Sequence, residues 1–158
     1  MRKIRVYVDT SVFGGTQDEE FAEPSRRFFE RVDQGEYLVL LSATTYGELE
    51  RAPEGVSRVL RRLSRQEFEE VPVDAEVRAL ADAYLEAGIV GRASADDALH
   101  VAAATVSGAD VILSWNFRHI VNYDRIRKFN AVNLMRGYRT LDVRSPLEMG
   151  YGDEAKDV

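Results

Sequence analysis

Cysteine is absent from this 158-residue chain, and proline (four), tryptophan (one) and histidine (two) are scarce. Without cysteine there are no disulfide bonds, so a disulfide-stapled scaffold is excluded. No apolar run approaches the ~18 residues of a membrane-spanning helix, and no leader-like segment precedes the first predicted strand, so we expect a cytoplasmic protein without membrane contact. The 45% hydrophobic content and ordinary glycine count exclude collagen-like and disordered classes and indicate one packed domain.

The formal net charge is −6, which disfavours a nucleic-acid binder because affinity for phosphate backbones comes largely from Lys and Arg. The distribution of the charge weakens this objection. Acidic residues are concentrated in residues 148–158, whereas basic residues outnumber acidic ones in residues 116–147. We expect residues 1–147 to form a single domain and residues 148–158 to form an acidic polar tail that frays.

Short apolar segments alternate with amphipathic ones along the chain. The β-branched and aromatic runs predict strands at residues 4–8, 37–41, 111–114 and 140–143, whereas residues 71–73 are too short to assign. Helical periodicity and capping residues predict helices at 25–34, 43–51, 56–63, 74–85, 94–106 and 123–135. A polar loop is expected to open at Gly14-Gly15. Because strands that alternate with helices pair in parallel, we predict an α/β fold, a three-layer α/β/α sandwich around a central parallel sheet.

Oxygen-bearing side chains follow the predicted strands. Asp9 comes directly after the first strand, Glu48 lies in the first turns of the helix after the second, Asp96 and Asp97 begin the alanine-rich helix, and Asn116 follows the third strand. Open parallel sheets bind ligands outside the carboxyl ends of their strands, so we expect these side chains at one rim. Clustered carboxylates repel one another unless a cation is bound, and oxygen ligands without cysteine favour Mg²⁺ or Mn²⁺.

Each of the three acids also has a purely structural interpretation. Asp9 could cap the turn that follows it. Glu48 completes a capping-box pattern that begins at Thr45, and Asp97 completes one that begins at Ser94. Three unrelated caps would place the acids at one edge only by accident, whereas a single metal site accounts for all of them together.

Other phosphate chemistries fit these residues less well. A P-loop needs a lysine that the turn at Gly14-Gly15 lacks, and no GxGxxG follows a strand. A metal-free ribonuclease could use the only two histidines, but we interpret His100 as a helix-face residue bonded to a neighbour. A phosphate-monoester hydrolase or phosphotransfer domain that uses Asp9 covalently stays open, with Arg118 in the loop where such a domain has a lysine.

Four segments carry a family resemblance, and they read Val6-Tyr-Val-Asp9-Thr-Ser-Val-Phe-Gly-Gly15, Thr45-Tyr-Gly-Glu48-Leu, Asp97-Ala-Leu-His-Val-Ala-Ala103 and Ile112-Leu-Ser-Trp-Asn-Phe-Arg-His-Ile120. In this order and spacing they resemble the PIN-domain family, particularly the VapC-like toxins of prokaryotic toxin-antitoxin pairs. The resemblance spans residues 4–147. It implies a parallel-sheet fold, a metal-dependent ribonuclease acting on RNA, a small antitoxin protein as partner, and a homodimer.

The resemblance also implies roles for individual residues. The family's first aspartate, helix glutamate and later aspartate ligate Mg²⁺ or Mn²⁺, and they correspond here to Asp9, Glu48 and Asp97. Ser11 corresponds to a polar residue that contacts these ligands without binding the metal itself.

The chain departs from the family at Asn116, where a fourth acid is common. An amide brings no negative charge, so a second ion is held more weakly. Asp96 could compensate as a further ligand, but adjacent helical residues point about 100° apart, and we expect Asp97 to be the one in the site. The resemblance therefore implies a Mg²⁺- or Mn²⁺-dependent endoribonuclease, and the alternative that Asn116 favours is a catalytically weak PIN-like RNA- or protein-binding module.

Overall fold

A single sheet of five parallel strands forms the centre of the molecule. The structure is a computed structural model that describes residues 2–149. In order along the chain, the strands are β1 (Ile4–Val8), β2 (Tyr37–Leu41), β3 (Phe68–Glu70), β4 (Val111–Leu113) and β5 (Asp142–Arg144). Their order in the sheet is β3-β2-β1-β4-β5, and each neighbouring pair runs parallel. The predicted central parallel sheet is thus confirmed.

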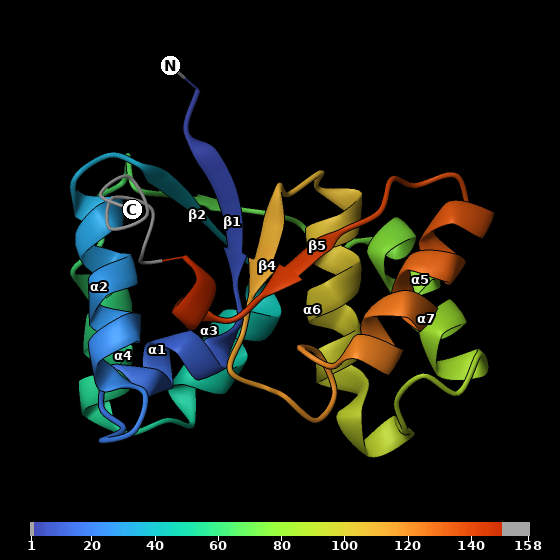
Figure 1. Cartoon of the computed structure of the whole chain (residues 1–158), viewed down its shortest axis with the longest axis horizontal. Helices are drawn as coiled ribbons and strands as arrows, with labels where there is room; N and C mark the ends of the chain where they lie inside the picture. Colours follow the sequence, from blue (N-terminus) through green and yellow to red (C-terminus); the bar gives the residue numbers. More distant parts are fainter. Residues whose placement is uncertain (1, 150–158) are drawn as a thin grey trace, which may run out of the picture.

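Helices cover both faces of this sheet, which confirms the predicted three layers. Figure 1 shows α1, α2, α3 and α4 on one side and α5, α6 and α7 on the other. The helices are α1 (Thr10–Gly15), α2 (Ala22–Asp33), α3 (Ala43–Glu50), α4 (Glu54–Arg61), α5 (Ala75–Glu86), α6 (Ala95–Val106) and α7 (Tyr123–Met135), with 3-10 turns η1 (Arg92–Ser94) and η2 (Pro146–Glu148). Within residues 2–149, no helix has the length and apolar character that a membrane crossing requires.

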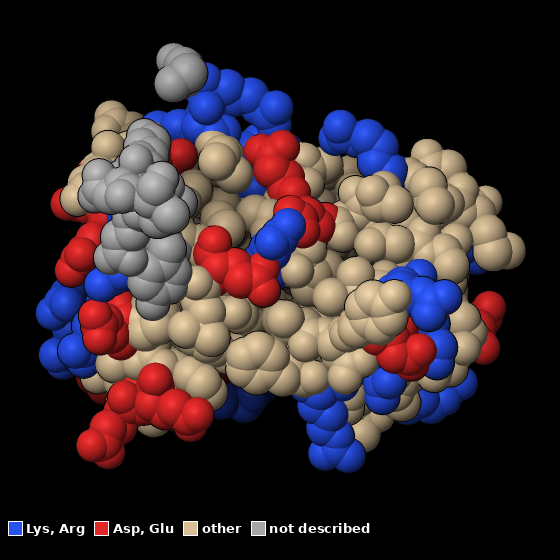
Figure 2. Space-filling view, viewed as in Figure 1, with Lys and Arg blue, Asp and Glu red and all other residues tan. Residues whose placement is uncertain are grey.

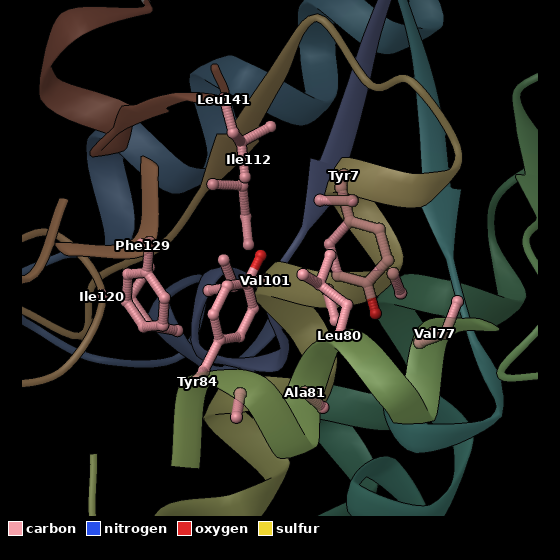
Figure 3. Close-up of a cluster of buried hydrophobic side chains, with 14 of the residues drawn as sticks. Tyr7, Val77, Leu80, Ala81, Tyr84, Val101, Ile112, Ile120, Phe129 and Leu141 are labelled. Atoms are coloured by element: carbon pink, nitrogen blue, oxygen red, sulfur yellow. The ribbon is translucent and has the colours of Figure 1, made fainter. Parts of the chain in front are cut away.

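The core is divided in two because successive strand residues face opposite sides of the sheet. Tyr7 and Ile112 belong to the cluster that packs against α5, α6 and α7. Val6 and Leu113, one residue away on each strand, belong to the cluster that packs against the other helices. Figure 3 shows the first cluster, in which Tyr84 of α5 and Ile112 of β4 point toward one another. Buried side chains on both faces explain why the strands are continuously apolar in sequence.

Helix α1 differs from the sequence prediction, which placed a loop at Gly14-Gly15. Both glycines lie inside the helix, and neither has a positive φ. A Cβ built on Gly15 would lie 2.5 Å from Ser25 Oγ and 2.7 Å from Trp115 Nε1. Gly15 therefore allows α1 to approach α2 and the segment after β4 closely, and it does not mark a turn.

The end of the described chain packs against α2 and β2. Arg31 Nη1 and the Tyr37 hydroxyl both donate hydrogen bonds to the Met149 carbonyl, at 2.8 and 3.0 Å. Glu148 pairs with Arg144 at 3.0 Å. Glu148 and Met149, which the sequence assigned to the tail, thus contact the rest of the domain, and residues 150–158 of that tail lie outside the described residues.

Candidate active site

Asp9 stands at the carboxyl end of β1, and its side chain is almost completely buried, with 5% of the residue exposed. Its Oδ2 accepts hydrogen bonds of 2.7 Å from both Ser11 Oγ and Ser114 Oγ. The carboxylate makes no capping bond to the backbone of α1, although Asp9 is the N-cap residue. The turn-cap interpretation therefore does not account for the Asp9 carboxylate, which is held by two hydroxyl groups, one from α1 and one from the residue that follows β4.

Glu48 reaches the same edge from α3. Its Oε1 accepts hydrogen bonds from Thr10 Oγ1 at 3.0 Å and from His100 Nε2. The capping box of α3 begins at Ser42, whose N–H donates to Thr45 Oγ1, so the predicted box from Thr45 to Glu48 does not form. Burial raises the pKa of Glu48, but the hydrogen bond from His100 and the charges around it outweigh burial, and the pKa is lowered overall.

Asp97 lies in the first turn of α6, and its Oδ2 is 3.1 Å from His119 Nδ1. Ser94 Oγ also contacts this ring nitrogen, at 3.2 Å, and makes no capping bond, so the predicted capping box at Asp97 is not formed either. Burial, and next the negative charge of Asp9, raise the pKa of Asp97. A charge effect of this kind requires the two carboxyl groups to lie close together.

Asp96, the neighbouring acid, is exposed. It lines a shallow hollow of about 270 Å³ together with Arg51 at the end of α3 and Arg78 on α5. The two adjacent aspartates thus have different surroundings, as their angular separation on a helix implies.

His100 is fully buried on α6 and touches two of the acids. Its Nε2 hydrogen-bonds Glu48 Oε1 and lies 3.6 Å from Asp9 Oδ1, while its Nδ1 lies 2.7 Å from the Tyr7 hydroxyl. Burial lowers the pKa of His100, but its contacts with Tyr7, Glu48 and Asp9 outweigh burial and raise it well above its usual value. The sequence predicted a hydrogen-bonded neighbour but missed that this neighbour is an acid of the site; the three-residue spacing from Asp97 was the available signal.

Asn116 shapes the loop after β4. Its Oδ1 accepts hydrogen bonds from the backbone N–H groups of Arg118 (3.2 Å) and His119 (2.9 Å), and its own N–H donates to Ser114 Oγ at 2.9 Å. This turn brings His119 to Asp97, a contact that sequence reasoning also missed. Asn116 is therefore part of the same edge of the sheet, where its amide organises the loop.

The chemistry of this edge suits a hard cation. Within residues 2–149, no group of three or more acidic, histidine or cysteine side chains is arranged to hold a metal ion as it stands. The carboxylates instead accept hydrogen bonds from hydroxyl groups and histidines. Even so, Asp9, Glu48 and Asp97 converge from three separate elements and supply only oxygen donors, which is the donor set that Mg²⁺ and Mn²⁺ prefer. That these three acids grip one ion stays a prediction.

Comparisons with known proteins concern the family and the fold of the chain. The sequence profile described as PIN domain matches residues 6–125. The fold resembles a chain in the crystal structure of VapBC2 from Rickettsia felis bound to a DNA fragment from its promoter, with a TM-score of 0.58, 12% sequence identity, and coverage of 90% of this chain and 98% of that chain. At this identity the likeness concerns the fold alone. A search of curated protein sequences finds no match to the chain.

Proposed function

Because the chain belongs to the PIN domain family, we propose that it is a Mg²⁺- or Mn²⁺-dependent endoribonuclease that hydrolyses RNA phosphodiester bonds. The observation that carries this proposal is the convergence of Asp9, Glu48 and Asp97 at the carboxyl ends of the central strands, where each acid fails to make the structural cap that its sequence pattern suggested. Partly buried carboxyl groups with shifted pKa values, such as Glu48 and Asp97, are candidates for ligand binding when they lie at the carboxyl edge of a parallel sheet.

Each residue of the site has a proposed part in the reaction. Asp9 and Asp97 would hold the cation, and Glu48 would hold it or orient the attacking water. When bound, such an ion stabilises the charge that develops on the phosphate and makes water a stronger nucleophile near neutral pH. Ser11 keeps the Asp9 carboxylate in one orientation by donating to its Oδ2. Asn116 uses its Oδ1 for the loop, so its amide N–H groups are left to donate to a water or a phosphate oxygen.

RNA binding would depend on a few cations close to this edge. Figure 2 shows acidic side chains gathered over the loop between α1 and α2, and basic ones mixed with acidic ones over α7. This face therefore has no continuous basic platform. Arg51 and Arg78 line the hollow beside Asp96, and neither forms an ion pair within residues 2–149. The charge of Arg51 reaches Glu48. These two arginines are the proposed contacts for the phosphates of an RNA strand.

An exposed aromatic residue at the same edge suits an unpaired base. Phe117 follows Asn116 and is 46% exposed, whereas Trp115 is buried and stacks on Phe21 with ring centroids 4.2 Å apart. Trp115 is therefore part of the core and Phe117 is the side chain that could stack on a base. Because bases are accessible for stacking only in unpaired segments, we propose single-stranded RNA as the substrate.

A biological role follows from the family resemblance of the sequence. We propose that the chain is the toxin of a toxin-antitoxin pair, that it acts on RNA in the cytoplasm, that a small antitoxin protein inhibits it, and that it forms a homodimer. Induced expression in a bacterial host should then arrest growth, and the Asp9→Asn variant should not. Co-expression of a small reading frame encoded beside this gene should restore growth. Growth that continues under wild-type expression would contradict the toxin role.

The enzymatic proposal is tested with purified protein and an end-labelled single-stranded RNA. Cleavage should require MgCl₂ or MnCl₂, stop on addition of EDTA, and be lost in Asp9→Asn. Asp82→Asn is the matched control, since Asp82 is an exposed aspartate on α5, and it should cleave like the wild type. Cleavage that persists in EDTA or in Asp9→Asn overturns the proposed metal chemistry.

Asn116 supports a second candidate function, a PIN-like RNA- or protein-binding module with little catalytic activity. With an amide in place of a fourth carboxylate, the site has less negative charge to hold cations. Retained RNA binding without cleavage by the wild type in either metal ion would favour this second candidate.

A further inference from the structure

His100 connects the acids of the candidate site to the core. Its ring is fully buried, and both ring nitrogens have polar partners. Nε2 faces Glu48 and Asp9, while Nδ1 faces the hydroxyl of Tyr7. A carboxylate can only accept hydrogen bonds, so Nε2 is the donor in its contact with Glu48 Oε1. A buried histidine with this arrangement does more than fill space in the core.

The hydrogen bonds to Glu48 leave one of its oxygens available. His100 and Thr10 both donate to Oε1, and within the described part of the chain Oε2 accepts no hydrogen bond. Asp9 has the complementary arrangement, because its Oδ2 accepts from two serine hydroxyls while its Oδ1 faces His100. Nε2 of His100 therefore faces one oxygen of each acid, Oε1 of Glu48 and Oδ1 of Asp9, and keeps the two acids beside each other.

Tyr7 and Ser42 fix the orientation of this imidazole. The Tyr7 hydroxyl lies 2.7 Å from His100 Nδ1 and 2.7 Å from Ser42 Oγ, and all three side chains are buried. The rings of Tyr7 and His100 meet edge to face, with centroids 5.6 Å apart. Figure 3 shows the Tyr7 ring extending from β1 toward Leu80 of α5. Rotation of the imidazole would break contacts on both of its sides, so its direction is set by the core.

The contacts also form a closed circuit. Ser42 is the N-cap residue of α3, and Glu48 lies further along the same helix. The circuit runs from α3 through Tyr7 of β1 to His100 of α6 and back to α3 at Glu48. It ties together the three elements that carry the candidate ligands.

We propose that His100 is a positioning residue, oriented by Tyr7, which holds Glu48 beside Asp9 with one carboxylate oxygen directed to a divalent cation. The part of this proposal that concerns the cation rests on the proposed function. Outer partners that orient metal ligands typically change metal affinity by about 10- to 100-fold when they are removed.

Two variants separate the contact with Glu48 from the contact with Tyr7. The amide of an asparagine reaches the place of Nδ1, so His100→Asn keeps a partner for Tyr7 and loses the donor to Glu48. The longer His100→Gln reaches the place of Nε2 and keeps that donor. Both variants place an amide in the same buried position. We expect His100→Asn to bind Mn²⁺ about tenfold more weakly than the wild type, measured by electron paramagnetic resonance of free Mn²⁺, and His100→Gln to recover most of the affinity. Equal affinities in the two variants, or an affinity above that of the wild type, would overturn the proposal.

A measurement without metal tests the contact independently of the proposed ribonuclease activity. In EDTA, His100→Asn and Glu48→Val together should lower the thermal midpoint by less than the sum of their separate effects, because each removes the hydrogen bond between His100 and Glu48. Tyr7→Phe should be additive with His100→Asn, which keeps a partner for the Tyr7 hydroxyl, and non-additive with His100→Gln, which does not. Additive effects of the first pair overturn the positioning role even if RNA is cleaved. Non-additive effects in a protein that neither binds Mn²⁺ nor cleaves RNA support the His100 contact and contradict the ribonuclease instead.

Discussion

Asp9 Oδ2 accepts a hydrogen bond of 2.7 Å from Ser114 Oγ, a residue that lies 105 positions further along the chain. The contact forms because β1 and β4 are neighbours in the sheet, with Val8 paired to Leu113, so the residues that follow the two strands stand side by side. Parallel pairing of two strands that are far apart in sequence thereby brings the polar residues that follow them together in one site. The same serine hydroxyl accepts the backbone N–H of Asn116, which connects the buried acid to the next loop.

Ser114→Ala tests this relationship. The change removes the hydrogen bond to the buried Asp9 carboxylate and also the acceptor of the Asn116 N–H, and a hydrogen bond to a carboxylate is worth about 1.5–3 kcal/mol. We expect a decrease of about this size in the free energy of unfolding, measured with urea, together with weaker Mn²⁺ binding because Asp9 keeps only Ser11 as a hydroxyl donor. Ser107→Ala is the control, since the Ser107 hydroxyl donates to the carbonyl of Ala104, far from Asp9 in the chain. An unchanged unfolding free energy in Ser114→Ala would show that the bond to Asp9 is not formed.

The two aspartates that begin α6 are expected to differ sharply when each is replaced. Residues that only orient a metal ligand typically change metal affinity or activity by about 10- to 100-fold when they are removed. Asp97 is a proposed ligand, so Asp97→Asn should reduce cleavage by more than this. Asp96→Asn should retain activity, because Asp96 is exposed beside Arg51 and Arg78.

Stability gives a second readout for the same pair. The raised pKa of Asp97 arises from burial and from the charge of Asp9, so its ionised form costs folding free energy at neutral pH. Asp97→Asn should therefore be more stable than the wild type in EDTA while being less active, and Asp96→Asn should show neither effect. If Asp96→Asn lost more activity than Asp97→Asn, Asp96 and not Asp97 would be the residue that serves the site.

Most of the fold was predictable because its signals are local. The strand at Tyr37–Leu41 is a continuous apolar run, and α5 begins after Asp74, whose side chain accepts the N–H of Val77. Helix α1 was not predictable in this way. Its Gly14-Gly15 pair suggests a turn by local propensity, whereas the need for glycine arises from the contact of Gly15 with Trp115, a hundred residues away.

The candidate site was predictable only in outline. The sheet topology places Asp9 and Glu48 at one edge, and topology follows from the alternation of strands and helices. The partners of these acids depend on how α6 is rotated about its axis and on how the loop after β4 turns. His100 and His119 therefore emerge as neighbours of the acids only in three dimensions. The caps proposed for the acids do not form, and the acids contact the side chains of Ser11, Ser114, Thr10, His100 and His119 instead.

Asn116→Asp is expected to strengthen cation binding. The aspartate keeps an oxygen at the place of Oδ1, so it can still accept the N–H groups of Arg118 and His119, and it adds a negative charge near the other acids. We expect a lower thermal midpoint than the wild type in EDTA because of the added repulsion, and a larger stabilisation by Mn²⁺. Asn116→Ala, which removes the acceptor altogether, is the comparison. A Mn²⁺ affinity in Asn116→Asp no higher than that of the wild type would exclude this position from the ion's surroundings.

Arg51 and Arg78 are predicted to contact RNA phosphates. The double variant Arg51→Gln, Arg78→Gln should bind RNA more weakly. Its affinity should also depend less steeply on salt, with a plot of log affinity against log salt that is shallower by about 0.7 for each phosphate of the single strand that is no longer neutralised. Fluorescence anisotropy in EDTA at several KCl concentrations measures this without cleavage. Arg136→Gln is the control, because Arg136 is also exposed but lies at the end of α7. An equal salt slope in the double variant and the wild type would remove the hollow from the RNA path.

Gly15 and Gly14 provide a matched pair for the packing of α1, the helix that carries Thr10 and Ser11 into the site. A Cβ on Gly15 would lie 2.7 Å from Trp115 Nε1, so Gly15→Ala must displace buried groups, and overpacking of this kind costs about 1–3 kcal/mol. Gly14 has nothing within 4 Å of its built Cβ, and alanine there should stabilise the helix by up to about 1 kcal/mol. Because α1 presents Ser11 to Asp9, the displacement in Gly15→Ala should also weaken Mn²⁺ binding, which Gly14→Ala should leave unchanged. Urea denaturation and Mn²⁺ titration of the two variants check this, and equal unfolding free energies would mean that α1 does not approach Trp115 as closely as the structure has it.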